Sequence, residues 1–381
     1  MLVGVSDATI LPFIPLLLHE RGFGSADIGL LLAGMALAGF ATGPLWGYAA
    51  DLRVGSEVVL AATCAAAGCV SVLVFLAHDR TLLAVAVVAL WACRSSSASL
   101  ADAIALDRLG AERRAEYGGV RLWTSIGWAA AVLVWGAIIE TSAYGTAALL
   151  YPAALVGAVG WTLFGLGGRT ALVSRPTGAP LRRELVHVRP LLVFLTALFF
   201  AQTAFAAGFN FSSLRIAGLG GSAFLVAVAA SLQAWAEVPA MAWMTRLRGV
   251  VAAHHFYVGG CGVYAAVLLF WAVVTNPFSV ALARLVLGVG FALTYVGSVV
   301  VVDELVPSRL RATGQVAAKS VTFGLAPVAG GLGGGLVYGP VSPRAMFLAA
   351  GLFAAFAGLV ASQASASRPA TYHSSSGSKM S

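Results

Sequence analysis

Charged residues are scarce in this sequence. Only 10% of its 381 residues are charged and 60% are hydrophobic, whereas soluble domains carry about 25% charged residues. A chain of this length with so few charges cannot cover a surface that faces water. Its apolar side chains must therefore face lipid, which predicts an integral membrane protein and excludes a soluble globular domain.

Cysteine is also rare, and the patterns that mark metal or nucleotide sites are missing. No HExxH pattern and no Walker A pattern occur. The glycine-rich run at 324–339 lacks the Gly-Lys-Ser/Thr ending of a phosphate loop, so we expect it to serve helix packing. We expect no cofactor and no metal, and a polytopic membrane enzyme is a weak alternative. Four cysteines lie within apolar runs without disulfide or metal-ligand spacing: Cys64, Cys69, Cys93 and Cys261.

Long apolar runs fill most of the chain. A membrane-spanning helix needs about 20 apolar residues, and the sequence contains twelve such runs. We therefore expect an all-α, polytopic membrane protein. The expected spans are 1–18, 28–50, 57–77, 81–106, 119–139, 145–167, 190–213, 222–244, 250–274, 278–302, 313–337 and 342–363.

The basic residues lie mainly in alternate loops. If the N-terminus is cytoplasmic, most of the 23 Lys and Arg residues fall on the cytoplasmic side, and Arg94 and Arg284 lie well inside spans. This pattern predicts a multi-pass protein of the cell inner (plasma) membrane with both termini in the cytoplasm. The net charge of +8 is then explained by loops beside anionic lipid headgroups, and we expect no nucleic acid partner.

The longest interior loop divides the chain. It covers 168–189, is rich in Arg, and separates 1–167 from 190–363, each with six expected spans. We expect two six-helix bundles that form pseudo-repeats, a basic cytoplasmic linker between them, and a disordered cytoplasmic tail at 364–381. Such a layout is typical of transporters built from repeats. The first span begins directly at Met1, so the sequence leaves open whether this residue is the true start.

Four stretches carry a resemblance to a known family. They are LPFIPLLLHERGFGSADIGLLLAG at 11–34, GPLWGYAADLR at 43–53, SLADAIALDRLGAERRAEYGGVRLWTSIGWA at 99–129 and VDELVPSRLRATGQ at 302–315. The run Tyr-Gly-x-Val-Arg-Leu-Trp within the third stretch is the most specific. On these residues the chain resembles the major facilitator superfamily, in particular the lactose-permease-like branch that includes the 3-phenylpropionate permeases.

The resemblance implies alternating access by two six-helix halves, with a central site and often with proton coupling. We therefore expect a permease that moves a small organic solute (a carboxylate, aromatic acid, sugar or nucleoside) by proton symport. The alternative is a proton-coupled drug or metabolite exporter. The expected partners are the small-molecule substrate, protons and the lipid bilayer, and we expect a monomer.

Three ionisable residues are expected near the middle of the membrane, namely Asp7, Arg94 and Glu237, and the first two are expected to form a pair. Asp7 lies in the first span and Arg94 in the fourth, and the resemblance places both spans beside the central cavity. Burying one charge costs about 2.5–3.5 kcal/mol on insertion scales, so we expect the two to pair. Protonation of Asp7 would then release Arg94 for an anionic substrate. The alternative is a fixed pair that holds two helices together.

Glu237 and Arg284 are the corresponding candidates in the second half. Glu237 lies in LQAWAEVPAM, which is similar to the eighth helix of the family, and it is a candidate proton carrier. The alternative is a glutamate that only packs helices. Arg284 lies in the outer half of the tenth span and is a candidate for substrate binding. Related permeases tend to carry a His one turn later, where this chain has Leu287.

Other residues are candidates for gating. Asp51 and Arg53 match the cytoplasmic loop motif of the superfamily, although its usual basic cluster is replaced by Gly-Ser-Glu at 55–57. Asp102 is expected at the cytoplasmic edge of the fourth span, in contact with Arg108, Arg114 or Arg121. We expect Asp102 and Arg121 to act in gating, with substrate contact as the alternative for Asp102.

Neutral side chains complete the expected cavity. Gln202 and Asn210 lie in AQTAFAAGFNFSS, which resembles the seventh helix of the family, and both are candidates for substrate binding. Trp123 and Tyr295 could stack on a sugar or aromatic ring. For these two residues, packing between helices is the alternative role.

Overall fold

The computed structural model describes residues 1–110, 113, 117–141, 150–165, 189–247, 250–306 and 310–366. For residues 52, 53, 117–122, 150, 245, 312 and 364–366 it describes the backbone alone. Every regular element in this part of the chain is helical. The expected all-α fold is therefore confirmed. The expected linker at 168–188 and the tail from 367 onward lie outside the described residues.

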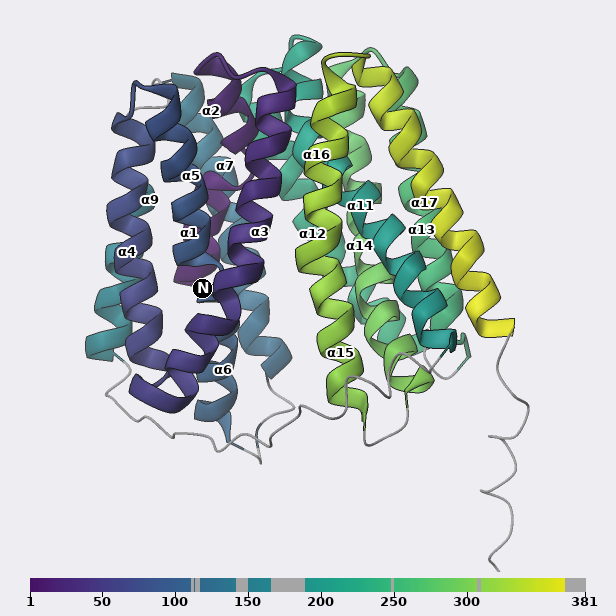
Figure 1. Ribbon diagram of the computed structural model, residues 1–381, viewed down its shortest axis with the longest axis horizontal. Coiled ribbons are helices and arrows are strands. Elements are labelled where there is room, and N and C mark those ends of the chain that lie inside the picture. The colour runs from purple at the N-terminus through teal and green to yellow at the C-terminus, as the bar shows by residue number, and fades with distance from the viewer. Residues whose placement is uncertain are drawn as a thin grey trace, which may run out of the picture.

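The helices form two groups that lie side by side in Figure 1. The first group comprises α1 (Leu2–Ile10), α2 (Ile14–Glu20), α3 (Ser25–Ala49), the π-helical η1 (Ala50–Val54), α4 (Ser56–Leu76), α5 (Arg80–Arg94), α6 (Ser97–Leu109), α7 (Tyr117–Thr141), α9 (Leu150–Gly160) and η3 (Trp161–Gly165). The second group comprises α11 (Arg189–Gly218), α12 (Ala223–Leu247), α13 (Ala253–Val273), α14 (Pro277–Leu305), α15 (Arg311–Ser320), η5 (Val321–Leu325), α16 (Ala326–Tyr338) and α17 (Pro343–Ala366).

Eleven helical stretches in the described part are long and apolar enough to cross a membrane. A shorter apolar helix, Tyr151–Gly165, occupies the place of the remaining expected span. The predicted span count therefore agrees with eleven long helices and one shorter helix. The outer residues of that predicted span, 145–149 and 166–167, lie outside the described part.

Two expected spans are interrupted, which the sequence analysis did not predict. The first span breaks between α1 and α2, because Pro12 has no N–H to continue the helical hydrogen bonds. The fourth span breaks between α5 and α6 at Ser95 and Ser96, where the Ser95 hydroxyl donates to the Ala92 carbonyl (3.3 Å). Asp7 lies one turn before the first break, and Arg94 is the last residue of α5.

Some predicted boundaries were wrong. The seventh helix begins at Arg189 and continues to Gly218, so Arg189 and Arg215 are helical and not loop residues. Within the last turn of this helix, Arg215 Nη2 donates to the carbonyl of Val274, the residue that follows α13 (2.8 Å). The last helix continues through residues 364–366, where the sequence analysis placed the start of the tail, since its final turns are rich in Ala.

The two groups repeat one structural detail. In the first, Arg21 follows α2 and donates to the carbonyls of Phe75 and Ala77 at the end of α4 (3.0 and 2.6 Å). In the second, Arg215 lies in the last turn of α11 and donates to the carbonyl of Val274 after α13. Carbonyls at helix C-termini lack partners within the helix. Each Arg therefore closes the equivalent helix of its own group, as expected for two structural repeats.

Glycines bring the two groups into contact. α3 packs against α16, and α7 packs against α12. A Cβ atom at Gly29 of α3 would collide with Gly331 and Gly335 of α16, and one at Gly136 of α7 would collide with Ala227 of α12. These contacts lie within the first two turns of α3 and α12, in the middle and last turn of α16, and near the end of α7. In Figure 1 the two groups meet at this upper end and separate toward the lower end.

Candidate functional site

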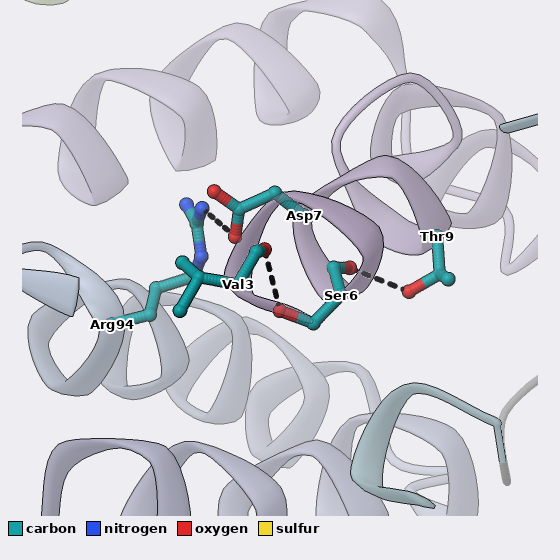
Figure 2. Close-up of polar contacts among 5 residues, drawn as sticks. All are labelled: Val3, Ser6, Asp7, Thr9 and Arg94. Carbon is teal, nitrogen blue, oxygen red and sulfur yellow. Dashed lines mark hydrogen bonds and ion pairs between the residues drawn. The ribbon is translucent and has the colours of Figure 1, made fainter. Parts of the chain in front are cut away.

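The first group of helices contains an ion pair between two distant segments. The Arg94 guanidinium donates to the Asp7 carboxylate, as the sequence analysis expected (Figure 2). The side chains are only 11% and 18% exposed, respectively. The hydroxyls of Ser6 and Thr9 donate to carbonyls within α1 instead (2.8 and 2.7 Å). Asp7 is therefore the side chain of this turn that reaches across to α5.

The surroundings of Arg94 leave one of its donors unused. Its guanidinium lies over the Trp91 ring, 4.3 Å from the centroid. The side chains of Tyr151 and Cys64 lie beside the ion pair. Within the described part of the chain, the buried Arg94 Nε has no hydrogen-bond partner. Arg94 therefore retains a buried donor that an acceptor on a bound solute could use.

The second group buries another guanidinium in a different environment. Arg284 of α14 is 2% exposed. Its Nε and Nη2 both donate to Gln233 Oε1 of α12 (3.2 and 2.8 Å), and its Nη1 donates to Ser212 Oγ of α11 (2.5 Å). The Phe209 ring covers the guanidinium at 4.7 Å. The hydrogen bonds described for Arg284 therefore all reach neutral groups.

Glu237 joins this network through the same glutamine. It lies one turn after Gln233 on α12, and Gln233 Nε2 donates to Glu237 Oε1 (3.2 Å). Glu237 is partly exposed, whereas Gln233 is 5% exposed. Arg284 and Glu237 form no direct ion pair among the described residues. Gln233 therefore bridges a buried cation and a carboxyl group.

A glycine sets the distance between the two helices that carry this network. A Cβ atom at Gly288, one turn after Arg284, would collide with the Gln233 backbone carbonyl. Only glycine lets α12 approach α14 this closely at that point. The close approach brings the Gln233 amide within reach of the Arg284 guanidinium.

The neutral candidates have different surroundings. Gln202 of α11 is 4% exposed, and its Nε2 has no partner within the described residues. Asn210 lies two turns later on α11 and is partly buried. Tyr295 stacks on Phe291 of the same helix with a centroid distance of 5.5 Å, and its ring lies edge-on to Phe323 of η5 at 6.5 Å. Trp123 lies on α7 and is 60% exposed.

The gating candidates are only partly described. Asp51 lies in η1 and Asp102 in α6. The side chains of Arg53, Arg114 and Arg121 lie outside the described part. Arg108, one of the expected neighbours of Asp102, donates to the Glu57 carboxylate at the start of α4.

The sequence analysis missed four residues of these networks: Gln233, Ser212, Glu57 and Tyr151. Gln233 had a usable signal, because it precedes Glu237 by one helical turn and is therefore expected on the same face of α12. Glu57 is 6% exposed at the first turn of its helix, and nothing in its local sequence distinguishes it from a solvated loop residue. Ser212 and Tyr151 are uncharged, so their position within expected spans did not mark them as candidates for a functional site.

Comparisons with known proteins give a consistent result. The model of the MFS_1 like family matches residues 6–349. The maltose permease of Geobacillus stearothermophilus is 28% identical over 323 residues, which cover 83% of this chain and 80% of that permease. Among solved structures, a point mutant of the nucleoside transporter NupG matches with a TM-score of 0.82, at 16% identity over 96% of both chains. The POT family transporter PepTSo matches with a TM-score of 0.75, at 10% identity over 96% of both chains.

The similarities to the solved structures establish the fold alone, because the sequence identities are low. The family match is broader, since it covers most of the chain. The family and these structural neighbours are transporters and not enzymes. This protein therefore belongs to the MFS_1 like family and is a multi-pass membrane transporter of small solutes with the major facilitator fold.

Proposed function

We propose that this transporter imports a small organic solute together with protons, and that the favoured solute carries an anionic group such as a carboxylate. The observation that carries this proposal is the buried Arg284, whose described hydrogen bonds reach only the neutral Gln233 and Ser212. Burying a cation among neutral groups is costly. An anion bound beside Arg284 would lower that cost.

Glu237 is the proposed proton carrier. A carboxyl group in a low-dielectric environment binds a proton more readily than one in water. When Glu237 is protonated, the charge of Arg284 loses its nearest compensation, and an anion binds more favourably. Proton binding and anion binding therefore support each other, which is the requirement for symport.

The pair of Asp7 and Arg94 provides a second proposed site. Protonation of Asp7 would release the guanidinium of Arg94, which already has one buried donor without a partner among the described residues. The alternative remains a fixed pair that holds α1 against α5. The two roles predict different effects of Asp7→Asn on solute binding: tighter binding of an anion if the pair is releasable, and no such gain if the pair is fixed.

The remaining candidates keep the roles expected from the sequence. Substrate binding is proposed for Gln202, Asn210, Tyr295 and Trp123. Gating is proposed for Asp51, Arg53, Asp102 and Arg121. We also propose that the protein acts as a monomer.

The loop charges support a proposed orientation in the plasma membrane, with both termini in the cytoplasm. The domain division follows the same pattern, with bundles at 1–167 and 190–363, a cytoplasmic linker at 168–189 and a tail at 364–381. In this orientation the end at which Gly29 meets Gly331 is the outer end. The conformation described here is then closed toward the outside.

A neutral sugar is a second candidate substrate. It is supported by the similarity to a maltose permease over 83% of this chain. For such a solute, Gln202 and the pair of Asp7 and Arg94 would supply hydrogen bonds, and no charge would be compensated. Export of a drug or metabolite remains the alternative direction of transport.

Uptake by reconstituted vesicles tests the proposal. The purified protein in liposomes is given an inward proton gradient and labelled 3-phenylpropionate, maltose or uridine. We expect accumulation of the carboxylate, and its loss when an uncoupler is added. One proton carried with one monoanion moves no net charge, so a potential set with potassium and valinomycin should leave the rate unchanged. Accumulation of maltose or uridine alone would overturn the anion proposal, and failure of the gradient to drive any uptake would overturn symport.

A further inference from the structure

We propose that Gln233 is a positioning residue that keeps the proton carrier Glu237 apart from the buried cation Arg284 while linking the two. This inference rests on the proposed function, because it takes Glu237 as the group that binds and releases the proton. Gln233 itself neither binds nor releases the transported proton. Three observations support this role. They are the orientation of the Gln233 amide, the compatibility of its hydrogen bonds with both protonation states of Glu237, and the charges around Glu237.

The direction of the Gln233 amide is determined by chemistry. A guanidinium has donors and no acceptors, so the atom that receives two N–H groups of Arg284 must be the amide oxygen. The amide nitrogen then points along α12 toward Glu237 and donates to its Oε1 at 3.2 Å. Flipping the amide would place two donors against Arg284. The bridge therefore has one stable orientation.

This bridge tolerates both protonation states of Glu237. The amide nitrogen needs an acceptor, and both an ionised carboxylate and the carbonyl oxygen of a neutral carboxyl group provide one. Gln233 can therefore hold Arg284 in place while Glu237 gains or loses a proton. A direct contact between the two charged groups would behave differently, because an adjacent cation favours the ionised carboxylate and opposes protonation.

Few other charges act on Glu237. The groups that influence it electrostatically are Arg284 of α14 and Tyr264 of α13. The other titratable or charged side chains described on the helices packed against α12 are Tyr295, Asp303 and Glu304 on α14, Glu140 on α7, and Arg189 and Arg215 on α11. Those on α7 and α11 lie in the first or last turn of their helices. Arg284 is therefore the one nearby cation whose separation from Glu237 the Gln233 bridge can control, among the side chains described here.

Two substitutions at position 233 should move the pH dependence of uptake in opposite directions. In Gln233→Met the side chain keeps its length but loses the amide, so Arg284 can turn to Glu237 and pair with it directly. Protonation then becomes harder, and the pH of half-maximal gradient-driven uptake should fall by about one unit or more. In Gln233→Glu a second carboxylate faces both groups. One of the two carboxyl groups then holds its proton more strongly, and the half-maximal pH should rise.

The matched control is Gln315→Met, since the Gln315 amide donates to the Val299 carbonyl (2.7 Å) away from this network. Its pH profile should coincide with that of the unchanged protein. Counterflow exchange at fixed pH reports whether each variant is folded and binds solute. Opposite shifts for the two substitutions at 233 support the inference, because a purely structural residue would not produce them. Unchanged profiles, or shifts in the same direction, overturn it. If the unchanged protein shows no gradient-driven uptake, the proposed function has failed instead.

Discussion

At the residue scale, the two halves bury a guanidinium group in different ways. Arg94 has a carboxylate partner in Asp7, whereas Arg284 is held by the neutral Gln233 and Ser212. Each guanidinium also lies over an aromatic ring, which lowers the cost of removing it from water. The positive charge of Arg94 is therefore balanced by Asp7. The positive charge of Arg284 is left for a bound solute or the proton carrier to balance.

The ion pair of Asp7 and Arg94 should stabilise the fold. Breaking a buried pair by removing one partner costs about 3–5 kcal/mol, and the partial exposure of this pair makes the lower end of that range the better guide. We therefore expect Asp7→Asn to lower the thermal midpoint of the protein in detergent. The double substitution Asp7→Asn with Arg94→Gln should recover part of the loss, because it removes the uncompensated charge.

A tryptophan or dye-based thermal melt measures this effect. If the double variant melts below the single variant, the attraction between the two charges is not what stabilises this contact. If Asp7→Asn binds the anionic solute more tightly than the unchanged protein does, the releasable-pair role is favoured over the fixed-pair role.

At the element scale, the sequence predicted the helices well because an apolar run of about 20 residues is typical of a membrane-spanning helix and of few other structures. It did not predict the breaks at Pro12 and Ser95, because a proline or a serine pair also occurs in unbroken spanning helices. The pairing of Asp7 with Arg94 was predictable, since isolated charges in spans are costly. The bridge through Gln233 was not predicted, because a neutral amide gives no comparable signal and its partner depends on how α12 packs against α14.

The packing of α12 on α14 depends on Gly288. In Gly288→Ala the new methyl group would meet the Gln233 carbonyl, so the helices must separate. We expect the bonds from Arg284 to Gln233 to lengthen and the maximal uptake rate to fall by about tenfold, because a displacement of about 1 Å near a site has effects of this size or larger. The measurement is gradient-driven uptake at matched protein levels.

Gly262→Ala is the matched control for this substitution. Gly262 lies on α13, and an added Cβ atom meets nothing within 4 Å. It should transport normally. Equal activity of the two alanine variants would show that the close approach at Gly288 is dispensable.

At the scale of the whole molecule, the two groups of helices meet at one end. The contacts there include a carboxylate from one group and a helix N-terminus from the other, since the Phe224 N–H in the first turn of α12 donates to Glu140 of α7 (3.1 Å). The N-terminus of a helix carries partial positive charge. The contact therefore favours the conformation in which the upper ends in Figure 1 are together.

Weakening this contact should shift the conformational equilibrium. Glu140→Gln keeps the size of the side chain but removes the charge, whose interaction with a helix terminus contributes about 0.3–1 kcal/mol. We expect the upper end to open about two- to fivefold more often. A cysteine introduced at Ser25, which lies against Gly339 at this end, should then react faster with a membrane-impermeant maleimide. The background should lack the native cysteines, and an unchanged labelling rate would contradict the role of Glu140.

The substitution Glu237→Gln tests the central claim most directly. The amide keeps an acceptor for Gln233 Nε2 and cannot release a proton. Reconstituted protein should lose proton-driven accumulation of the labelled carboxylate, because no proton is carried, and it should retain exchange of that solute between equal concentrations on the two sides. If both accumulation and exchange persist unchanged, Glu237 is not the proton carrier and the proposed mechanism is wrong.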